Sequence, residues 1–164
     1  MRKCKKGFTV VELVITIALV GILSATAAIT VSALVNIQSN ISKTTSTQKD
    51  IEDASNNIKD AVSFVSVKNS ICAFEIKACV ESEITFTNTV DSADYSLSFA
   101  EKTLRFTSDY AGENEYLQYA FSNAYSTLKT IEFSYDASLH LLKATITPES
   151  GSTTNHVYPL EVLR

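Results

Sequence analysis

The sequence has 164 residues, which is enough for one folded domain. Its net charge is −4, and because Arg2, Lys3, Lys5 and Lys6 all precede the first long apolar block, the remainder of the chain carries −8. Nucleic-acid binding generally requires clustered lysine and arginine, so no direct binding of nucleic acid by this acidic body is expected.

The apolar block begins close to the N-terminus. No charged residue occurs from Leu13 to Val35, a stretch longer than the roughly 20 residues that span a bilayer as a helix. The basic residues before it predict a cytoplasmic N-terminus and a C-terminal body on the outer side of the membrane. These features are typical of a secretory signal peptide and of a membrane anchor alike.

Glu12 distinguishes the two interpretations. A carboxylate at the edge of an apolar segment costs several kcal/mol unless it is paired, and such residues usually mark function. A secretory signal has no use for this residue. A protein whose helices assemble side by side does, because the carboxylate can pair with a positive group of a neighbouring subunit and fix the register.

The segment Lys6-Gly7-Phe8-Thr9-Val10-Val11-Glu12-Leu13 resembles the processing motif of type IV prepilins and pseudopilins. In that family a short basic leader ends in glycine, and a membrane peptidase cuts after it. The new first residue, usually phenylalanine, is N-methylated, and the fifth mature residue is glutamate. Here these positions are Gly7, Phe8 and Glu12, and Gly21 falls in the usual small-residue stretch.

The resemblance implies a structural subunit of a type IV pilus, a type II secretion pseudopilus or a competence pilus. Its implied partners are the prepilin peptidase and methylase, membrane lipid before assembly, other pilin subunits and, indirectly, the assembly platform and ATPase. Localisation would begin in the bacterial cytoplasmic membrane and end in a filament outside it. Major subunits usually carry a proline where Ile29 stands, and this sequence has no proline before Pro148, which favours a minor subunit.

Two alternatives remain open from the residues alone. Ala25-Thr26-Ala27 satisfies the small-residue pattern of a secretory cleavage site, so cleavage there would release a soluble extracellular binding domain. A single-pass anchor that carries such a domain, with no filament role, is the other.

The chain divides into a leader (1–7), a transmembrane or filament-core helix (8–35), an amphipathic continuation of that helix (36–68) and a β-rich head (69–164). Glycine and proline are absent from Ile22 to Ala111, so nothing forces the helix to stop at the membrane surface. Two separate helices joined by a linker at 42–50 are the alternative.

Alternation of apolar and polar residues predicts strands in the head. Short connections favour an antiparallel meander with one face covered by the helix, and therefore an α+β fold. The clear sets are Tyr95, Leu97 and Phe99; Leu104 and Phe106; Leu117, Tyr119 and Phe121; Ile131, Phe133 and Tyr135; and Leu142 to Thr147, with weaker sets at Ile84 and Phe86 and at Leu160 and Val162.

Few other residues suggest chemistry. Cys72 and Cys79 follow the predicted helix on the oxidising side of the membrane, which favours a disulfide over two reduced thiols. No catalytic motif, metal pattern or cofactor motif is present, so an enzyme, a metal and a cofactor are not expected. The acidic cluster of Asp109, Glu113 and Glu115 is interpreted as a solvated turn rather than as a calcium site. The isolated His140 and His156 are interpreted as surface strand residues rather than as metal ligands.

Overall fold

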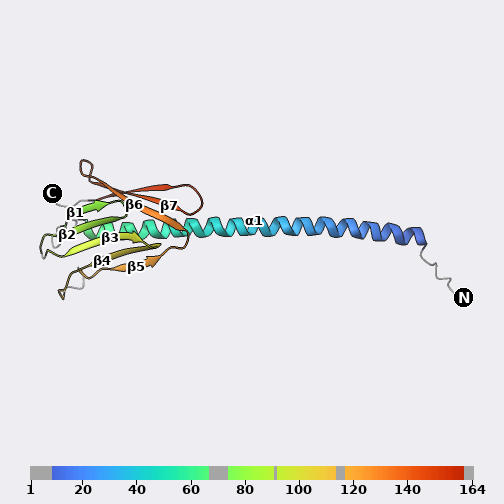
Figure 1. Ribbon diagram of the computed structural model, residues 1–164, viewed down its shortest axis with the longest axis horizontal. Coiled ribbons are helices and arrows are strands. Elements are labelled where there is room, and N and C mark those ends of the chain that lie inside the picture. The colour runs from blue at the N-terminus through green and yellow to red at the C-terminus, as the bar shows by residue number, and fades with distance from the viewer. Residues whose placement is uncertain (1–8, 67–73, 91, 114–116, 161–164) are drawn as a thin grey trace. The chain divides into compact units, whose positions relative to one another are not determined.

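A computed structural model describes residues 9–66, 74–90, 92–113 and 117–160. In these ranges the chain forms one helix, α1 (Val10–Val65), followed by antiparallel strands (Figure 1). This arrangement confirms the α+β prediction. The chain divides into two compact units, Met1–Thr44 and Thr45–Arg164. The first contains the N-terminal part of α1, and the second contains the rest of α1 and the strands.

Helix α1 is unbroken from Val10 to Val65, through the polar run at 42–50. The alternative of two helices with a linker there is therefore wrong. The physical reason is the absence of glycine and proline from this run, since serine, threonine, lysine and glutamine weaken a helix only slightly. After Val65 the backbone makes one further helical hydrogen bond, from Ser66 N to Val62 O at 2.9 Å.

The strands form two antiparallel sheets. The five-stranded sheet has the order β1-β2-β3-β4-β5, and the three-stranded sheet has the order β6-β7-β8. Their bounds are β1 (Phe74–Val80), β2 (Glu83–Asn88), β3 (Asp94–Ala100), β4 (Thr103–Ser108), β5 (Phe121–Ala124), β6 (Leu128–Asp136), β7 (Leu141–Pro148) and β8 (Thr154–Pro159).

Two sequence predictions of strands are corrected. Leu117 and Tyr119 precede β5 and lie in no strand. The reason is that Tyr119 packs its ring on Phe64 of α1, with centroids 5.2 Å apart, while pairing with β4 reaches only to Phe121, opposite Phe106. At the C-terminal end the last strand is Thr154–Pro159, and Leu160 is buried just after it; Val162 lies outside the described residues.

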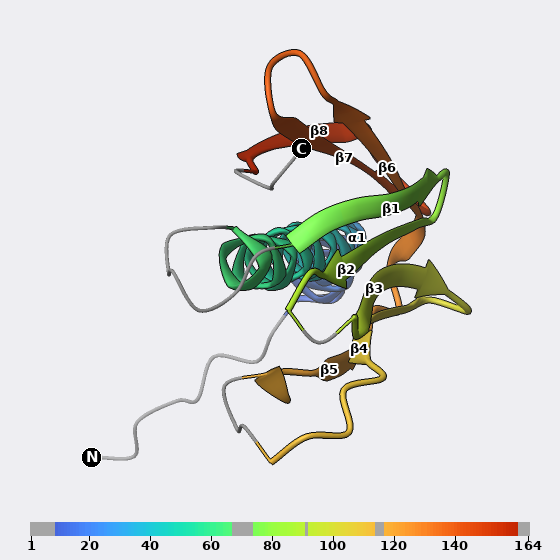
Figure 2. The same cartoon turned by 90° about the vertical axis from the view of Figure 1, so that its left-hand side faces the viewer.

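The single meander that was expected is split in two. After β5 the chain leaves the five-stranded sheet, and β6 passes β3, β2 and β1 before it forms the second sheet with β7 and β8, so that both sheets lie around the second part of α1 (Figure 2). A backbone hydrogen bond joins the sheets, from Phe133 N in β6 to Glu81 O after β1, at 2.7 Å. Sequence alternation could not reveal this crossing, because it reports the face of each strand and not its neighbour.

The core lies between the sheets and the helix segment that begins at Thr45. The buried helix residues lie on one face of α1, and strands such as β3 and β7 bury alternate side chains. The largest fully buried side chains are Tyr95, Phe74, Phe86, Phe106, Ile58, Ile84, Leu97, Leu104, Leu128, Ile131, Leu142 and Ile146.

Candidate functional site

The N-terminus of α1 is closed by a capping box. Thr9 precedes the first helical residue, and its Oγ1 accepts a hydrogen bond from Glu12 N at 3.3 Å. The Glu12 carboxylate turns back toward Thr9, with Oε2 lying 3.5 Å from both Thr9 N and Thr9 Oγ1. This reciprocal arrangement satisfies backbone N–H groups that a helix end would otherwise leave without partners.

The position of Glu12 also suits the helix dipole. A negative charge in the first turn is stabilised by the partial positive charge at the helix N-terminus. The capping box was not identified from sequence, although the pattern Thr9-x-x-Glu12 is its signature.

The helix that follows presents apolar side chains on all sides. Residues 10–46 are exposed around the full circumference in the described structure, and they include most of the exposed large apolar residues of the chain. By length and composition α1 is able to cross a membrane. A surface of this kind requires either lipid or other apolar helices as its surroundings.

Several hydroxyl groups in this apolar stretch make hydrogen bonds within the helix. Thr16 Oγ1 donates to Glu12 O at 2.6 Å, and Thr30 Oγ1 donates to Thr26 O at 2.8 Å. Ser32 Oγ donates to Ala28 O at 3.0 Å. Because these bonds stay within one helix, the hydroxyls can enter an apolar environment without losing a hydrogen bond.

The predicted processing residues Gly7 and Phe8 lie outside the described residues, as does Cys72. Cys79 lies on β1, where its Sγ is 3.6 Å from Phe133 O of β6. Partial burial beside β6 raises the pKa of this thiol. Cys79 has no disulfide in the described part of the chain, so its pairing with Cys72 stays a prediction.

The acidic loop and the histidines have structural contacts. Asp109 Oδ1 accepts a hydrogen bond from Asp94 N at 2.6 Å, and Glu115 lies outside the described residues. His140 is in the β6–β7 turn rather than in a strand, with φ at 52°. His156 is on β8 and faces α1, where its Nδ1 is 3.1 Å from Ser55 Oγ. Within the described ranges, no three His, Cys, Asp or Glu side chains come close enough to hold a metal.

An open polar groove of about 550 Å³ lies between α1 and β5 in the second unit. Its lining includes Asp50, Asp53, Asn57, Asn123 and Tyr125. Asp50 and Asn57 both make hydrogen bonds from the helix to the segment between β5 and β6. These contacts cannot be predicted from the sequence, because residues as far apart as Asp50 and Thr127, 77 positions, carry no spacing signal.

Comparison with known proteins gives one match. Residues 2–28 match the family model of the prokaryotic N-terminal methylation motif, which is the type IV pilin/prepilin signature. No curated protein and no solved structure matches the chain. The match covers the basic segment, Gly7, Phe8, Glu12 and the start of the apolar helix, which are the residues that carry the resemblance seen in the sequence.

The motif and the apolar helix together support a pilin-like subunit that is processed as a prepilin and anchored in a membrane. Proteins with this motif are structural subunits rather than enzymes. The long helix followed by antiparallel sheets is the layout that such subunits have.

Proposed function

We propose that this chain is a minor structural subunit of a type IV pilus, a type II secretion pseudopilus or a competence pilus. The observation that carries the proposal is the prepilin signature at residues 2–28 running directly into a helix with a fully exposed apolar surface. The absence of proline from this helix, including the position of Ile29, supports the minor role.

Processing would remove residues 1–7 and leave Phe8 as the N-methylated first residue. The prepilin peptidase and methylase would act on the cytoplasmic side of the membrane, and the head would lie outside as a single-pass protein. The assembly platform and its ATPase would then move the subunit out of the membrane into a filament. Contacts between helices in such a filament are heterologous, so they propagate instead of closing into a ring.

Glu12 would set the axial register of the subunit in the filament. Its carboxylate accepts hydrogen bonds from Thr9 N and Thr9 Oγ1, both at 3.5 Å, which is long for hydrogen bonds to a carboxylate. A positive N-terminal amine of a neighbouring subunit would be a stronger partner than these neutral groups. Assembly would therefore replace the contacts within the subunit by a charge pair between subunits.

The experiment that tests this proposal compares Glu12→Ala and Glu12→Gln with Thr26→Ala in the native host. Both Glu12 variants are expected to be processed normally and to reach the membrane, but to be lost from the sheared filament or pseudopilus fraction by at least about tenfold, because they lack the charge. Thr26→Ala changes a hydroxyl in the same helix and serves as the control. Normal incorporation of Glu12→Ala would refute the register role.

We also propose that Cys72 and Cys79 form a disulfide after export. Its loop is short, and closing it would stabilise the head by about 2–3 kcal/mol in the chain-entropy model. Thiol labelling of the denatured chain, with and without reductant, would detect the bond. Two labelled thiols in the mature protein without reductant would show that it is absent; Cys4 would leave with the leader.

A further inference from the structure

The contact between α1 and the two sheets has two chemically different parts. From Ile58 to Val65 the helix presents apolar side chains, and Phe64 contacts the rings of Phe74, Tyr95, Phe106 and Tyr119 at centroid distances of 5.2–5.9 Å. From Asp50 to Asn57 it makes directed hydrogen bonds to the sheets and their connection. We call the second set, made by Asp50, Ser55 and Asn57, the polar collar.

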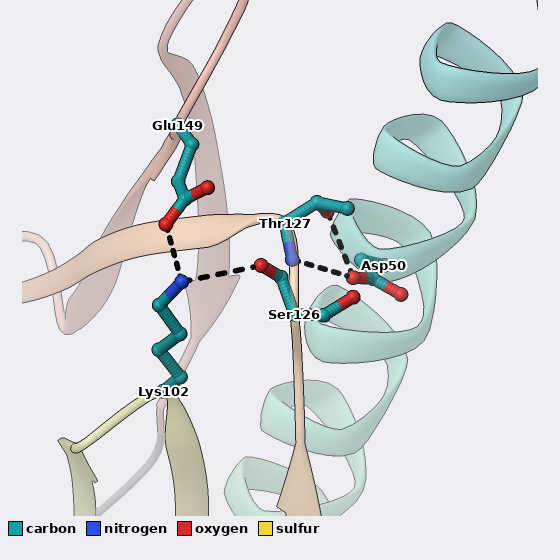
Figure 3. A network of polar contacts seen from close by, with 5 residues as sticks. All are labelled: Asp50, Lys102, Ser126, Thr127 and Glu149. Atoms are coloured by element: carbon teal, nitrogen blue, oxygen red, sulfur yellow. Dashed lines mark hydrogen bonds and ion pairs between the residues drawn. The ribbon is translucent and has the colours of Figure 1, made fainter. Parts of the chain in front are cut away.

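Asp50 makes the best-defined contact of the collar. Its Oδ2 accepts hydrogen bonds from Thr127 N at 3.1 Å and from Thr127 Oγ1 at 2.8 Å. Figure 3 shows the carboxylate beside Thr127, at the point where the chain crosses from the first sheet to the second. Two hydrogen bonds from one residue to one half-buried carboxylate restrict both its distance and its direction.

The connection between β5 and β6, residues 125–127, makes hydrogen bonds to residues of both sheets. Tyr125 N donates to Lys102 O at 2.8 Å, and Glu149 N donates to Thr127 O at 2.8 Å. Lys102 Nζ lies between Ser126 O, at 3.4 Å, and the carboxylate of Glu149, with which it forms an ion pair (Figure 3). The β3–β4 turn, the end of β7 and the helix therefore meet at residues 125–127.

The other two collar residues fix the helix from different directions. Asn57 Nδ2 donates to the hydroxyl of the buried Tyr125 at 2.5 Å. Ser55 Oγ lies 2.8 Å from the hydroxyl of Tyr158 on β8, and that hydroxyl also donates to Ser55 O at 3.1 Å. The collar thus contacts the connection and the outer strand of the second sheet within two helical turns.

Apolar contacts and hydrogen bonds restrict motion differently. An apolar helix face can rotate or slide by a small amount and still bury similar area, because the hydrophobic effect is not directional. A half-buried carboxylate cannot shift in this way, because its hydrogen-bond donors would then be desolvated and unpaired, which costs free energy. Polar groups in apolar interfaces are known to specify register at a small cost in stability.

We propose that the polar collar fixes the rotation of the head about the helix segment Thr45–Val65, and that Asp50 is its principal positioning residue. The apolar and aromatic contacts supply the stability of the head, and the collar selects one orientation. This inference rests on the proposed function for its biological meaning. When the helix is the element that assembles, the rotation of the head about it decides which head surface meets the next subunit.

The test uses the full-length chain in detergent micelles. Its three native cysteines are replaced by serine, and one cysteine is introduced at each position that carries a label. Spin labels at Glu52 on α1 and Lys143 on β7, both exposed, report the orientation of the helix in the head by their distance distribution. Amide exchange at Thr127 reports the Asp50 contact directly. The variants are Asp50→Ala, Asp50→Asn as the conservative replacement, and Asp53→Ala as the control, an exposed carboxylate that lines the same groove but does not belong to the collar.

Asp50→Ala is expected to broaden the distance distribution and to speed amide exchange at Thr127 by roughly tenfold to hundredfold. Asp50→Asn, which keeps one acceptor oxygen, should lie between Asp50→Ala and wild type, and Asp53→Ala should match wild type. An unchanged narrow distribution and unchanged exchange in Asp50→Ala would overturn the proposal. So would loss of protection at core amides such as Leu97 and Ile131, because Asp50 would then be required for folding rather than for orientation.

Neither measurement requires a filament, so failure here is distinct from failure of the proposed function. A variant with a broadened distribution and normal processing is expected to incorporate poorly into filaments. Normal incorporation of such a variant would show that head orientation does not matter for assembly, and would remove the functional part of the proposal.

Discussion

At the scale of single residues, several carboxylates of the described chain accept hydrogen bonds from specific partners. Glu12 faces Thr9 at the helix N-terminus, and Asp50 holds Thr127. On the head surface Asp94 forms an ion pair with Lys77, and Thr87 Oγ1 donates to its other oxygen at 2.5 Å.

The Asp94 cluster predicts a pH effect on stability. The hydrogen bond from Lys77, with that from Thr87, lowers the pKa of Asp94 below its ordinary value. Because the folded-state pKa is lower than the unfolded-state pKa, the contribution to stability is present above about pH 4 and is lost as pH falls through the folded-state pKa. In Asp94→Asn the free energy of unfolding is therefore expected to fall less steeply as the pH decreases below about 4.

Chemical denaturation at several pH values measures this effect, with the exposed Glu132→Gln as the control. A part of the acid dependence should remain in Asp94→Asn, because hydrogen bonds from Ser138 and Leu139 also lower the pKa of Asp136. An acid dependence identical to that of wild type would contradict the assignment to Asp94.

A second residue-scale prediction concerns Phe64. Its ring stands at the centre of the aromatic cluster between α1 and the five-stranded sheet. Because the side chain is half-buried, Phe64→Ala should cost about 2–3 kcal/mol of unfolding free energy, somewhat less than a fully buried phenylalanine. The exposed neighbour Ser63→Ala should change it by less than about 0.5 kcal/mol. Equal effects of the two variants in urea denaturation would show that the cluster does not stabilise the head.

At the scale of elements, the β3–β4 hairpin is strained. Ala100 pairs with Thr103, and the two residues of the turn, Glu101 and Lys102, have φ values of 50° and 60°. This is the type I′ geometry that glycine and asparagine adopt more easily. The turn is maintained because the Lys102 carbonyl accepts a hydrogen bond from Tyr125 and its amine pairs with Glu149.

Relief of this strain should stabilise the head. Glu101→Asn is expected to raise the free energy of unfolding by about 0.5–1 kcal/mol, since asparagine tolerates positive φ. The matched control is Glu132→Asn, at an exposed position in the middle of β6, which should be neutral or slightly destabilising. A destabilised Glu101→Asn variant, measured by its urea midpoint, would contradict the strain argument.

The elements themselves could largely be predicted from sequence. The lack of glycine and proline after Gly21 gave the long helix, and alternation gave most strands, as at Ile131, Phe133 and Tyr135. The division into two sheets could not be predicted, because it depends on the crossing at residues 125–127. The alternation of Leu117, Tyr119 and Phe121 predicts a strand. The same pattern also arises when a ring packs on a helix, as that of Tyr119 does, so it does not distinguish the two cases.

At the scale of the whole molecule, the two compact units differ in whether their apolar side chains are exposed or buried. The first contains a helix whose apolar side chains are exposed, and the second contains a core of its own built on the later turns of the same helix. The motif at residues 2–28 belongs to the first unit. The sequence predicted this site because the spacing from Gly7 to Glu12 is local. The polar collar is built from contacts that only the folded chain brings together.

Processing of the chain as a prepilin is tested by the intact mass and the N-terminal sequence of the protein from its native membrane. We predict a chain that begins at Phe8 and carries one added methyl group. A chain that begins after Ala27 would instead show a secreted domain, and an unprocessed chain would show a plain membrane anchor. Either of these results would contradict processing as a prepilin.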